Sequence, residues 1–302
     1  MYDRILFPAD GSEGANEVFD YALALAEAQD ATLYLLHVAD TTRDSVTRIG
    51  GEVVDVLERE GEQIVAELAE RATARHVSTV TDVIQGAVPE TITTYAEELS
   101  IDLIVMPTRG RTGLQQLLLG SSTDRVIRQT TTPVLTLRPD DTAVRYPYQN
   151  VLVPTDGSDC ATAALEHAID LVTATQATLH LLSVVDVTSP GADVYSEHQV
   201  DAIEERAKQI VAESAGLAEA ESVESVVEAL EFDSAISRGI LSYIDDHEID
   251  LVVVGTHGRT GVERYLLGSV TEKLIRTAPV PVLTIPESMP ETENRSPHRS
   301  DG

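Results

Sequence analysis

A glycine-spaced stretch at residues 250–271 carries the residue types that can hold an anion, and it reads DLVVVGTHGRTGVERYLLGSVT. The apolar, β-branched run 250–254 is typical of a buried parallel strand, and residues 270–276 have helical spacing. Between these two segments lie Gly255, Gly258, Gly268 and Ser269. A helix that begins there directs unpaired N–H groups and the positive end of its dipole at an anion, and glycines allow close approach. The stretch therefore predicts a phosphate cradle.

Other chemical motifs do not match the chain. Walker A requires a Lys and a Ser or Thr directly after the second glycine, and the GxGxxG spacing is also different. The chain contains neither HExxH nor a pair of histidines four residues apart, so no metal site is predicted. It contains no GxSxG nucleophile elbow. The glycine stretch instead resembles the Gly-x2-Gly-x9-Gly-Ser motif of ATP-binding universal stress proteins, with Gly255, Gly258, Gly268 and Ser269 at the four matching positions.

The charge balance is strongly acidic. The 302 residues include 51 Asp and Glu against 21 Lys and Arg, which gives a formal net charge of -30. Such a surface repels phosphate backbones and anionic membranes, so neither nucleic acid nor a membrane is an expected partner. The carboxylates are dispersed rather than gathered in a block, and only Lys208 and Lys273 are lysines. This pattern favours a halophilic protein that is adapted to high salt, where the repulsion between its own carboxylates is screened. We expect a haloarchaeal source.

Several compartments and chemistries are disfavoured by the composition. No apolar run of 18 residues occurs, and the chain opens with the strand-like segment 4–7, so we expect neither a membrane span nor a signal peptide. The single cysteine, Cys160, excludes an intramolecular disulfide framework and a Cys-based metal cluster. A cytoplasmic location is the expectation.

The chain contains an internal repeat. Residues 2–40 align without a gap on 148–186, and residues 102–137 align on 250–285, so the second copy holds two extra residues in between. At this length two domains are expected. We place the first domain at 1–140 and the second at 148–286. The remaining segment, 287–302, is rich in Pro, Glu and Ser, which predicts a disordered tail.

Each copy alternates strands with helices. The Asp-Gly-Ser sequences at 10–12 and 156–158 supply the turn and N-cap chemistry for a helix after the first strand. In the first copy a longer loop is expected before a helix at 53–75. The order of elements predicts right-handed crossovers and a parallel sheet with helices on both faces, an α/β fold. A doubly wound sheet of this kind binds ligands beyond the carboxyl ends of its strands.

The resemblance covers nearly the whole chain and implies two tandem Rossmann-like domains of the adenine nucleotide α-hydrolase-like group. Each would hold a five-stranded parallel sheet of order 3-2-1-4-5, with the ligand crevice between strands one and four. ATP is the implied ligand, with any Mg²⁺ or Mn²⁺ carried by the nucleotide. The residues implied to bind it in the second copy are Asp156, Val184, Gly255, Gly258, Gly268, Ser269 and Val270. The first-copy counterparts are Asp10, Val38, Gly110, Gly120 and Ser121. From the residues alone, Asp156 also fits a helix cap or turn former.

Side chains around the glycine loops separate the two copies. Pro107 stands where the second copy has Gly255. Proline removes an N–H donor and fixes φ, so the second domain is predicted to be the better nucleotide site and the first a degenerate one. Arg259 and Arg111 each follow a loop glycine and fit either a charge-assisted bond to phosphate or simple solvation. His257 is expected to be an exposed loop side chain, with a phosphate contact as the alternative.

These observations favour an ATP-binding universal stress protein that acts as a stress-response regulator or sensor, not as a dedicated enzyme. The loop lacks the lysine and the Walker B acid with which ATP-hydrolysing enzymes stabilise developing charge. Two alternatives stay open: a slow ATPase or adenylyl-transferring enzyme, and a ligand-free scaffold. We expect the two domains to pack as an intramolecular pseudo-dimer. In the scaffold alternative, this contact is made through the edges of the fifth strands. A further homodimer is left open.

Overall fold

The computed structural model describes residues 1–40, 46–49, 52–109, 119–139, 146–187, 197–258 and 267–286, with the backbone alone at 46–49, 52–55 and 197–200. The predicted disordered tail, 287–302, lies outside the described residues. The elements of the first half are β1 (Arg4–Pro8), α1 (Glu13–Gln29), β2 (Thr32–Asp40), β3 (Val46–Ile49), β4 (Glu52–Asp55), α2 (Val56–Ala74), β5 (Thr79–Gly86), α3 (Val88–Glu98), β6 (Leu103–Pro107), α4 (Ser121–Gln129) and β7 (Val134–Leu137). Those of the second half are β8 (Asn150–Pro154), α5 (Asp159–Thr175), β9 (Thr178–Asp186), α6 (Glu197–Ala220), β10 (Val226–Asp233), α7 (Ile236–Asp246), β11 (Leu251–Gly255), α8 (Ser269–Thr277) and β12 (Val282–Ile285).

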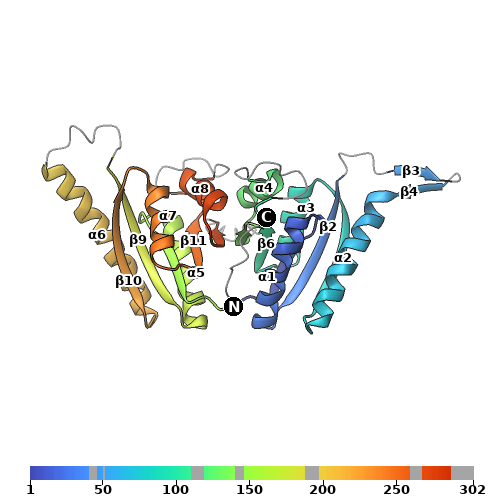
Figure 1. The fold of residues 1–302 in the computed structure, drawn as a ribbon, viewed down its shortest axis with the longest axis horizontal. Coiled ribbons are helices and arrows are strands. Elements are labelled where there is room, and N and C mark those ends of the chain that lie inside the picture. The colour runs from blue at the N-terminus through green and yellow to red at the C-terminus, as the bar shows by residue number, and fades with distance from the viewer. Residues whose placement is uncertain are drawn as a thin grey trace, which may run out of the picture.

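Ten strands form one continuous sheet in the order β10-β9-β8-β11-β12-β7-β6-β1-β2-β5. Within each half the strands are parallel and follow the predicted order 3-2-1-4-5, so the predicted fold class is confirmed. Residues 53–55 are a correction, because they belong to the antiparallel β3–β4 hairpin and not to the helix expected over 53–75. Figure 1 shows the hairpin projecting from the first half, ahead of α2.

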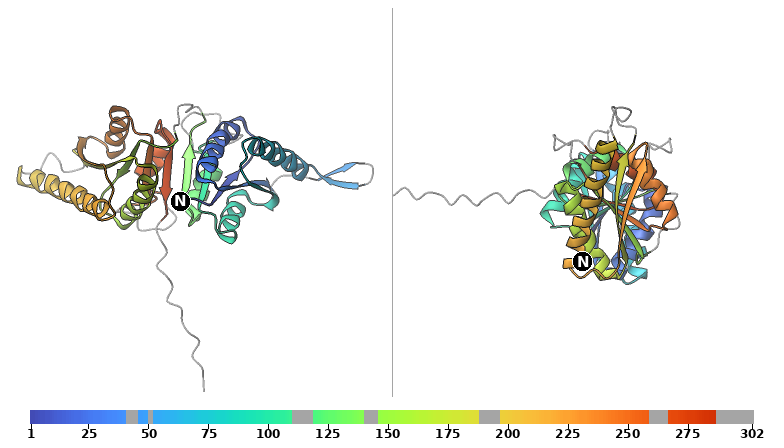
Figure 2. Two further views of the ribbon diagram at one scale, coloured as in Figure 1. Left: turned by 90° about the horizontal axis from the view of Figure 1, so that it is seen from below. Right: turned by 90° about the vertical axis from the view of Figure 1, so that its left-hand side faces the viewer.

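The sheet is covered on both faces by helices, as Figure 2 shows. Alternate residues of one strand enter different cores: Ile5 and Phe7 pack in the core that contains α1, α2, α5 and α6, whereas Leu6 packs in the core of α3, α4, α7 and α8. Successive side chains of a strand point to opposite faces, so strands buried on both faces have continuous apolar runs. Among the described residues, no helix is both long and apolar enough to cross a membrane.

The two halves join through their fifth strands. β12 pairs antiparallel with β7, with Leu283 opposite Leu135. Thr136 Oγ1 donates to Val282 O at 3.1 Å, and Thr284 Oγ1 donates to Val134 O at 3.0 Å, so the two hydroxyl bonds are related by the pseudo-twofold axis between the halves. The halves thus form an intramolecular pair with one shared sheet. Figure 1 shows α4 and α8, and with them the carboxyl ends of the strands in both halves, on the same side of the molecule.

A second reciprocal contact closes the junction on the α1 and α5 face. Tyr2 Oη lies 2.8 Å from His167 Nε2, and Tyr148 Oη hydrogen-bonds Tyr21 Oη. Tyr2 aligns with Tyr148 and Tyr21 with His167 at the same offset of 146 residues, so each half offers one tyrosine to the helix of the other. Burial lowers the pKa of His167, which favours its neutral ring.

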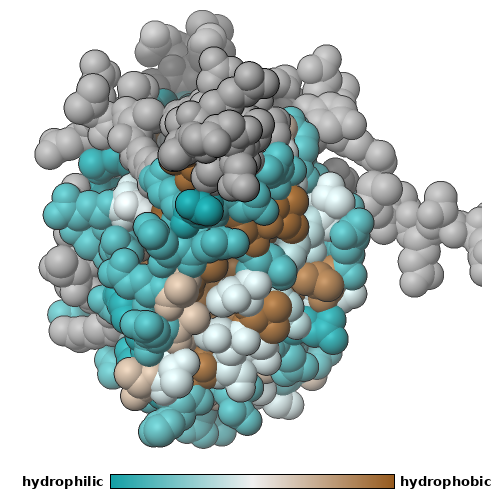
Figure 3. Space-filling view, turned by 90° about the vertical axis from the view of Figure 1, so that its right-hand side faces the viewer, coloured by the Kyte–Doolittle hydropathy of each residue, from teal (hydrophilic) through white to brown (hydrophobic). Residues whose placement is uncertain are grey.

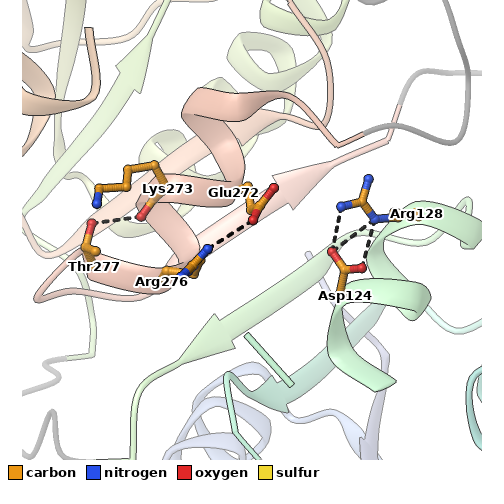
Figure 4. A network of polar contacts seen from close by, with 6 residues as sticks. All are labelled: Asp124, Arg128, Glu272, Lys273, Arg276 and Thr277. Atoms are coloured by element: carbon orange, nitrogen blue, oxygen red, sulfur yellow. Dashed lines mark hydrogen bonds and ion pairs between the residues drawn. The ribbon is translucent and has the colours of Figure 1, made fainter. Parts of the chain in front are cut away.

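Two matching ion pairs flank the central strands on the other face (Figure 4). Asp124 and Arg128 form an i,i+4 pair on α4 at 2.8 Å, and Glu272 and Arg276 form its counterpart on α8 at 3.2 Å. The pKa of Arg128 is raised by its hydrogen bonds to Asp124, with a contribution from the charge of Glu272 across the boundary. The charges of the two halves are therefore electrostatically coupled at the junction.

The outer ends of the sheet are the edge strands β5 and β10. Figure 3 views the end of the molecule where β5 and α2 lie, and hydrophilic residues there surround smaller hydrophobic areas. Val80 on β5 is 38% exposed, and Phe232 on β10 is 46% exposed. Both edge strands also carry carboxylates, such as Asp82 and Glu228, which disfavour pairing with another sheet.

Candidate functional site

The predicted turn at the end of the first strand is present in both halves. Asp156 Oδ1 accepts a hydrogen bond from Ser158 N at 3.0 Å, and Ser158 Oγ caps α5 by accepting from Ala161 N at 3.3 Å. In the first half, Asp10 Oδ1 accepts from the N–H of Ser12, which caps α1 in the same way. The predicted turn at Asp10 and Asp156 and the predicted cap at Ser12 and Ser158 are therefore present, while the contact of the two aspartates with a nucleotide stays a prediction.

The second glycine of the motif lies beside this turn. A Cβ built on Gly258 would stand 3.0 Å from Asp156 Oδ2, and Gly258 is otherwise exposed. The loop after β11 and the turn after β8 thus meet over the same crevice, as the strand order requires. Two predicted site residues that are about 100 positions apart in the sequence are brought together here.

The third glycine begins a helix that has no side-chain cap. Gly268 is the N-cap of α8, with φ -59° and no side-chain cap bond, and its N–H donates to Thr256 O at 2.8 Å. Its backbone does not need glycine for conformational freedom; a Cβ would instead come 3.3 Å from Thr256 O. Gly120 begins α4 with the same geometry, and its Cβ would stand 3.3 Å from Thr108 O. The first-turn N–H groups, beginning at Ser269 or Ser121, therefore face the crevice end of the sheet without a capping side chain.

The helix start is tied to the end of the fourth strand by a buried threonine. Thr271 Oγ1 donates to Gly255 O at 2.8 Å, and Thr123 Oγ1 donates to Pro107 O at 3.0 Å. The hydroxyl fixes the helix N-terminus against the strand in both halves. Ser269 and Val270, which the family resemblance places at phosphate, belong to the first turn that this bond positions.

The first glycine of the motif has a packing role. Gly255 is the buried last residue of β11, and a Cβ there would lie 2.7 Å from Cys160 O and 2.8 Å from Cys160 C. In the first half, the equivalent positions hold Pro107 and Gly14, and a Cβ on Gly14 would meet Pro139 Cγ at 2.8 Å. Close approach of helix and strand explains why residue 255 is a glycine. The prediction that Pro107 makes the first site degenerate stays untested.

The second strand of each half extends past the first and leaves backbone groups at the crevice. β1 pairs with β2 only as far as Pro8 opposite Leu36, and β2 continues to Asp40. In the second half, Pro154 opposite Leu182 is the last pair, and β9 continues to Asp186. Val38 and Val184 lie in these extensions, where a backbone amide or carbonyl can meet a flat heterocycle edge-on.

A pocket of about 270 Å³ occupies this crevice in the first half. Four predicted residues line it: Asp10, Val38, Gly120 and Ser121. Other lining residues were not predicted from the sequence, and they include His37, Asp40, Glu60 and Met106. The half that the sequence describes as degenerate therefore has a formed cavity at the expected place.

The sequence of helix α2 contains one signal for the part of the pocket wall that was not predicted. Gly61 lies in the interior of α2, where glycine costs helix stability and often marks a close approach. A Cβ at Gly61 would lie 2.4 Å from the ring of His37. The glycine makes room for this imidazole beside the crevice.

Some predicted loop residues are not described by the structure, and one prediction is wrong. Gly110, Arg111 and Arg259 lie outside the described residues. His257 is half-buried and not an exposed side chain: its Nδ1 is 3.0 Å from Thr256 Oγ1, and its Nε2 is buried with no hydrogen-bond partner among the residues that the structure describes. The hydroxyl of the preceding threonine holds the ring inward.

The universal stress protein family model matches residues 1–138 and 147–286. A universal stress protein of Methanocaldococcus jannaschii is 32% identical over 141 residues, which span 46% of this chain and 83% of that protein. A universal stress protein of Bacillus subtilis is 32% identical over 148 residues, 46% of this chain and 100% of that protein.

One solved structure shares the fold over nearly the full length of the chain. The crystal structure of a universal stress protein from Archaeoglobus fulgidus matches with a TM-score of 0.72 and 23% identity, over 95% of this chain and 100% of that chain. A universal stress protein solved in complex with cAMP covers 47% of this chain and 98% of that chain, with 27% identity and a TM-score of 0.36, and that ligand is a property of that protein. The chain belongs to the universal stress protein family, as a tandem of two family domains.

Proposed function

We propose that this chain binds an adenine nucleotide, ATP, in its second half, and that it acts as a stress-response regulator or sensor in the cytoplasm rather than as an enzyme. One contrast between two helices carries the proposal. α5 begins at the crevice with a serine cap, whereas α8 begins at the same crevice with Gly268 and no side-chain cap. Its open N–H groups and the positive end of its dipole suit phosphate.

The remaining features support a nucleotide rather than a bare anion. Asp156 lies next to the glycine loop at Gly258, where its carboxylate could accept bonds from ribose hydroxyls. Val184 lies in the extension of β9, where backbone groups are available to an adenine edge. The phosphates would then lie toward Gly268, and the base toward β9.

A regulatory role is supported by what the glycine loop lacks in sequence. Residues 255–269 contain no lysine. Phosphoryl-transfer enzymes place a lysine and an acid-held metal around the transferring group, whereas the cationic side chains of this loop are Arg259 and Arg264. We therefore propose binding with at most slow, incidental hydrolysis. A cation such as Mg²⁺ would arrive with the nucleotide.

The test is a calorimetric titration of ATP into the full chain in molar potassium chloride, which screens the acidic surface. We expect one site per chain. Gly268→Val should abolish it, because the side chain would stand where phosphate must approach. Gly120→Val is the matched control, since a Cβ there meets the same distance of 3.3 Å to the preceding threonine carbonyl, and it should leave ATP binding unchanged.

Two outcomes would contradict the proposal. Undiminished ATP affinity in a folded Gly268→Val variant would remove the site assignment. No ATP binding by the wild-type chain would favour the scaffold, for which the shared sheet across β7 and β12 is the structural basis. Rapid multiple turnover of ATP would favour an enzyme.

A further inference from the structure

A tyrosine, a histidine and an asparagine form a chain of hydrogen bonds in the second half. Tyr243 lies on α7, and its hydroxyl oxygen Oη is 3.0 Å from His180 Nδ1 on β9. His180 Nε2 lies 3.4 Å from Oδ1 of Asn150, the first residue of β8. Tyr243 and His180 are only 3% and 6% exposed. The three residues lie toward the amino ends of the strands, at the opposite end of the sheet from the candidate nucleotide site.

The direction of each hydrogen bond is fixed from the outer end of this chain. Asn150 Nδ2 is 3.2 Å from Glu248 O, and a carbonyl can only accept, so the amide turns Oδ1 toward His180. Oδ1 is an acceptor as well, so the hydrogen of the neutral imidazole is on Nε2. Nδ1 is then an acceptor and receives the hydroxyl hydrogen of Tyr243. The base is therefore oriented before any reaction takes place.

His180 is neutral and able to take up a proton. Burial lowers its pKa, with a smaller contribution from the charge of His247. Burial and the charge of Glu231 raise the pKa of Tyr243, so its hydroxyl does not ionise near neutral pH. Removal of an electron, in contrast, makes a phenol strongly acidic. Tyr243 and His180 thus form a pair whose proton moves when the phenol ring is oxidised.

A second histidine connects the buried tyrosine with solvent. The ring of His247 is stacked on that of Tyr243, with centroids 3.8 Å apart and an angle of 12° between the planes. His247 is exposed, and its Nδ1 lies 3.1 Å from the carbonyl oxygen of Tyr243 one turn earlier. The first half has Leu99 at the equivalent position, 148 residues earlier. An electron can leave through the stacked rings, whereas a proton needs a partner at hydrogen-bond distance.

The first half has a different base at the equivalent position. The offset of 148 residues aligns Tyr95 with Tyr243, and the offset of 146 aligns Tyr34 with His180. Tyr95 Oη donates to Asp82 Oδ2 at 2.6 Å, so its partner is a carboxylate. The ordinary pKa of an aspartate is about 3.9, against about 6.5 for imidazole, so the carboxylate is the weaker proton acceptor. The first half therefore provides a matched tyrosine with a poorer base.

Tyrosine is the residue type on which oxidation of this chain would centre. The sequence has nine tyrosines, no tryptophan and a single cysteine, Cys160, which is buried. Tyr2 also contacts a histidine, with 2.8 Å between its Oη and His167 Nε2. Among the described residues, however, no hydrogen bond orients the other ring nitrogen of His167. Tyr243 is therefore the tyrosine with an imidazole held in the accepting orientation.

We propose that Tyr243 is a one-electron redox site that intercepts oxygen-centred radicals, with His180 as its proton acceptor and Asn150 as the residue that positions His180. A peroxyl radical takes one electron from the Tyr243 ring and a proton from water, and becomes a hydroperoxide. The phenolic proton passes from Oη to His180 Nδ1, which leaves a neutral tyrosyl radical beside an imidazolium. A thiolate then returns one electron and becomes a thiyl radical, and the proton goes back to Oη. This activity goes beyond the proposed function, because it uses neither a nucleotide nor the crevice.

The test is pulse radiolysis of the full chain with trichloromethylperoxyl radicals, followed by the absorption and electron paramagnetic resonance of the tyrosyl radical. We expect a fast phase of radical formation that Tyr243→Phe removes. Tyr95→Phe, the matched change in the first half, and Tyr2→Phe should each leave this phase in place. The fast phase should be slower in deuterium oxide, because a proton moves with the electron.

Variants of the base distinguish a proton acceptor from a packing residue. His180→Phe keeps a flat ring but removes the base, and it should slow the fast phase by about a hundredfold, the lower end of what a positioned proton acceptor contributes. Asn150→Leu should slow it by about tenfold, since one hydrogen bond that orients the imidazole is lost. Asn150→Asp keeps an acceptor for Nε2, and its rate should stay within about twofold of wild type.

Circular dichroism before the pulse shows whether each variant is folded. If His180→Phe does not fold, the two Asn150 variants and the isotope effect decide the question. The proposal is overturned if Tyr243→Phe leaves the fast phase unchanged, if the wild-type rate is the same in deuterium oxide, or if Asn150→Leu and Asn150→Asp react equally fast. The experiment contains no nucleotide, so a failure of ATP binding would contradict the proposed function and leave this result standing.

Discussion

Gly255→Ala tests whether the first motif glycine is a packing residue. The added Cβ would lie 2.7 Å from Cys160 O and 2.8 Å from Cys160 C, and both are backbone atoms of α5 that cannot rotate away. Overpacking of this kind costs about 1–3 kcal/mol. Replacing glycine by alanine returns about 0.4–1 kcal/mol through the unfolded chain. We expect a net loss of about 1–2 kcal/mol in the free energy of unfolding.

The assay is urea unfolding followed by circular dichroism in molar potassium chloride. Gly258→Ala is the matched control, because its Cβ meets only the end of the Asp156 side chain, at 3.0 Å. That variant should stay within about 0.5 kcal/mol of wild type while it disturbs ATP binding. Cys160→Gly, which recreates the residue at position 14 of the first half, removes only the 2.8 Å contact with the Cys160 Cβ, so most of the cost of Gly255→Ala should remain. A Gly255→Ala chain as stable as wild type would refute the packing interpretation.

Two further predictions concern the strand-to-helix connection and buried histidines. Thr271→Val leaves the buried carbonyl of Gly255 without the hydroxyl that donates to it at 2.8 Å. The loss should lower the free energy of unfolding by about 1–3 kcal/mol, measured by the same urea unfolding. A change below about 0.5 kcal/mol would contradict the role of the hydroxyl. Burial lowers the pKa of His167 and His180, so the unfolded chain binds more protons than the folded chain below about pH 6.5. The free energy of unfolding should therefore rise with pH up to that value and then level off. The slope should be at most about 1.4 kcal/mol per pH unit for each histidine. Urea midpoints at a series of pH values check this, and a slope unchanged in a His180→Gln variant would argue against its contribution.

The strand-helix pattern could be predicted because it depends on local periodicity. Strands and helices alternate in each half as expected, and the Asp-Gly-Ser sequences supply the turn and cap before α1 and α5. From the sequence, a loop followed by the first turn of a helix is expected at 46–55. The hairpin in this segment was missed, because apolar and polar residues do not alternate strongly there. Its existence depends on pairing, which a single segment does not encode.

The candidate site was predicted unevenly. Glycine spacing identified Gly258 and Gly268, since backbone approach and helix starts leave local signals. His37 and Glu60 were missed because a histidine in a strand and a glutamate on a helix look ordinary until the fold places them around one pocket. The inward position of His257 was missed for the same reason, because it depends on the neighbouring hydroxyl.

The sequence by itself determined the repeat, the fold class, the family and the edge of the sheet where a ligand belongs. These follow from periodicity, glycine spacing and strand order, all of which are written in short segments. Only the tertiary structure decided why Gly255 is a glycine, which side chains form the wall of the first-half pocket, and that the carboxyl ends of the strands in both halves lie on one side of the molecule. Those properties are distances between atoms far apart in the chain, and they exist only after the helices have packed on the strands.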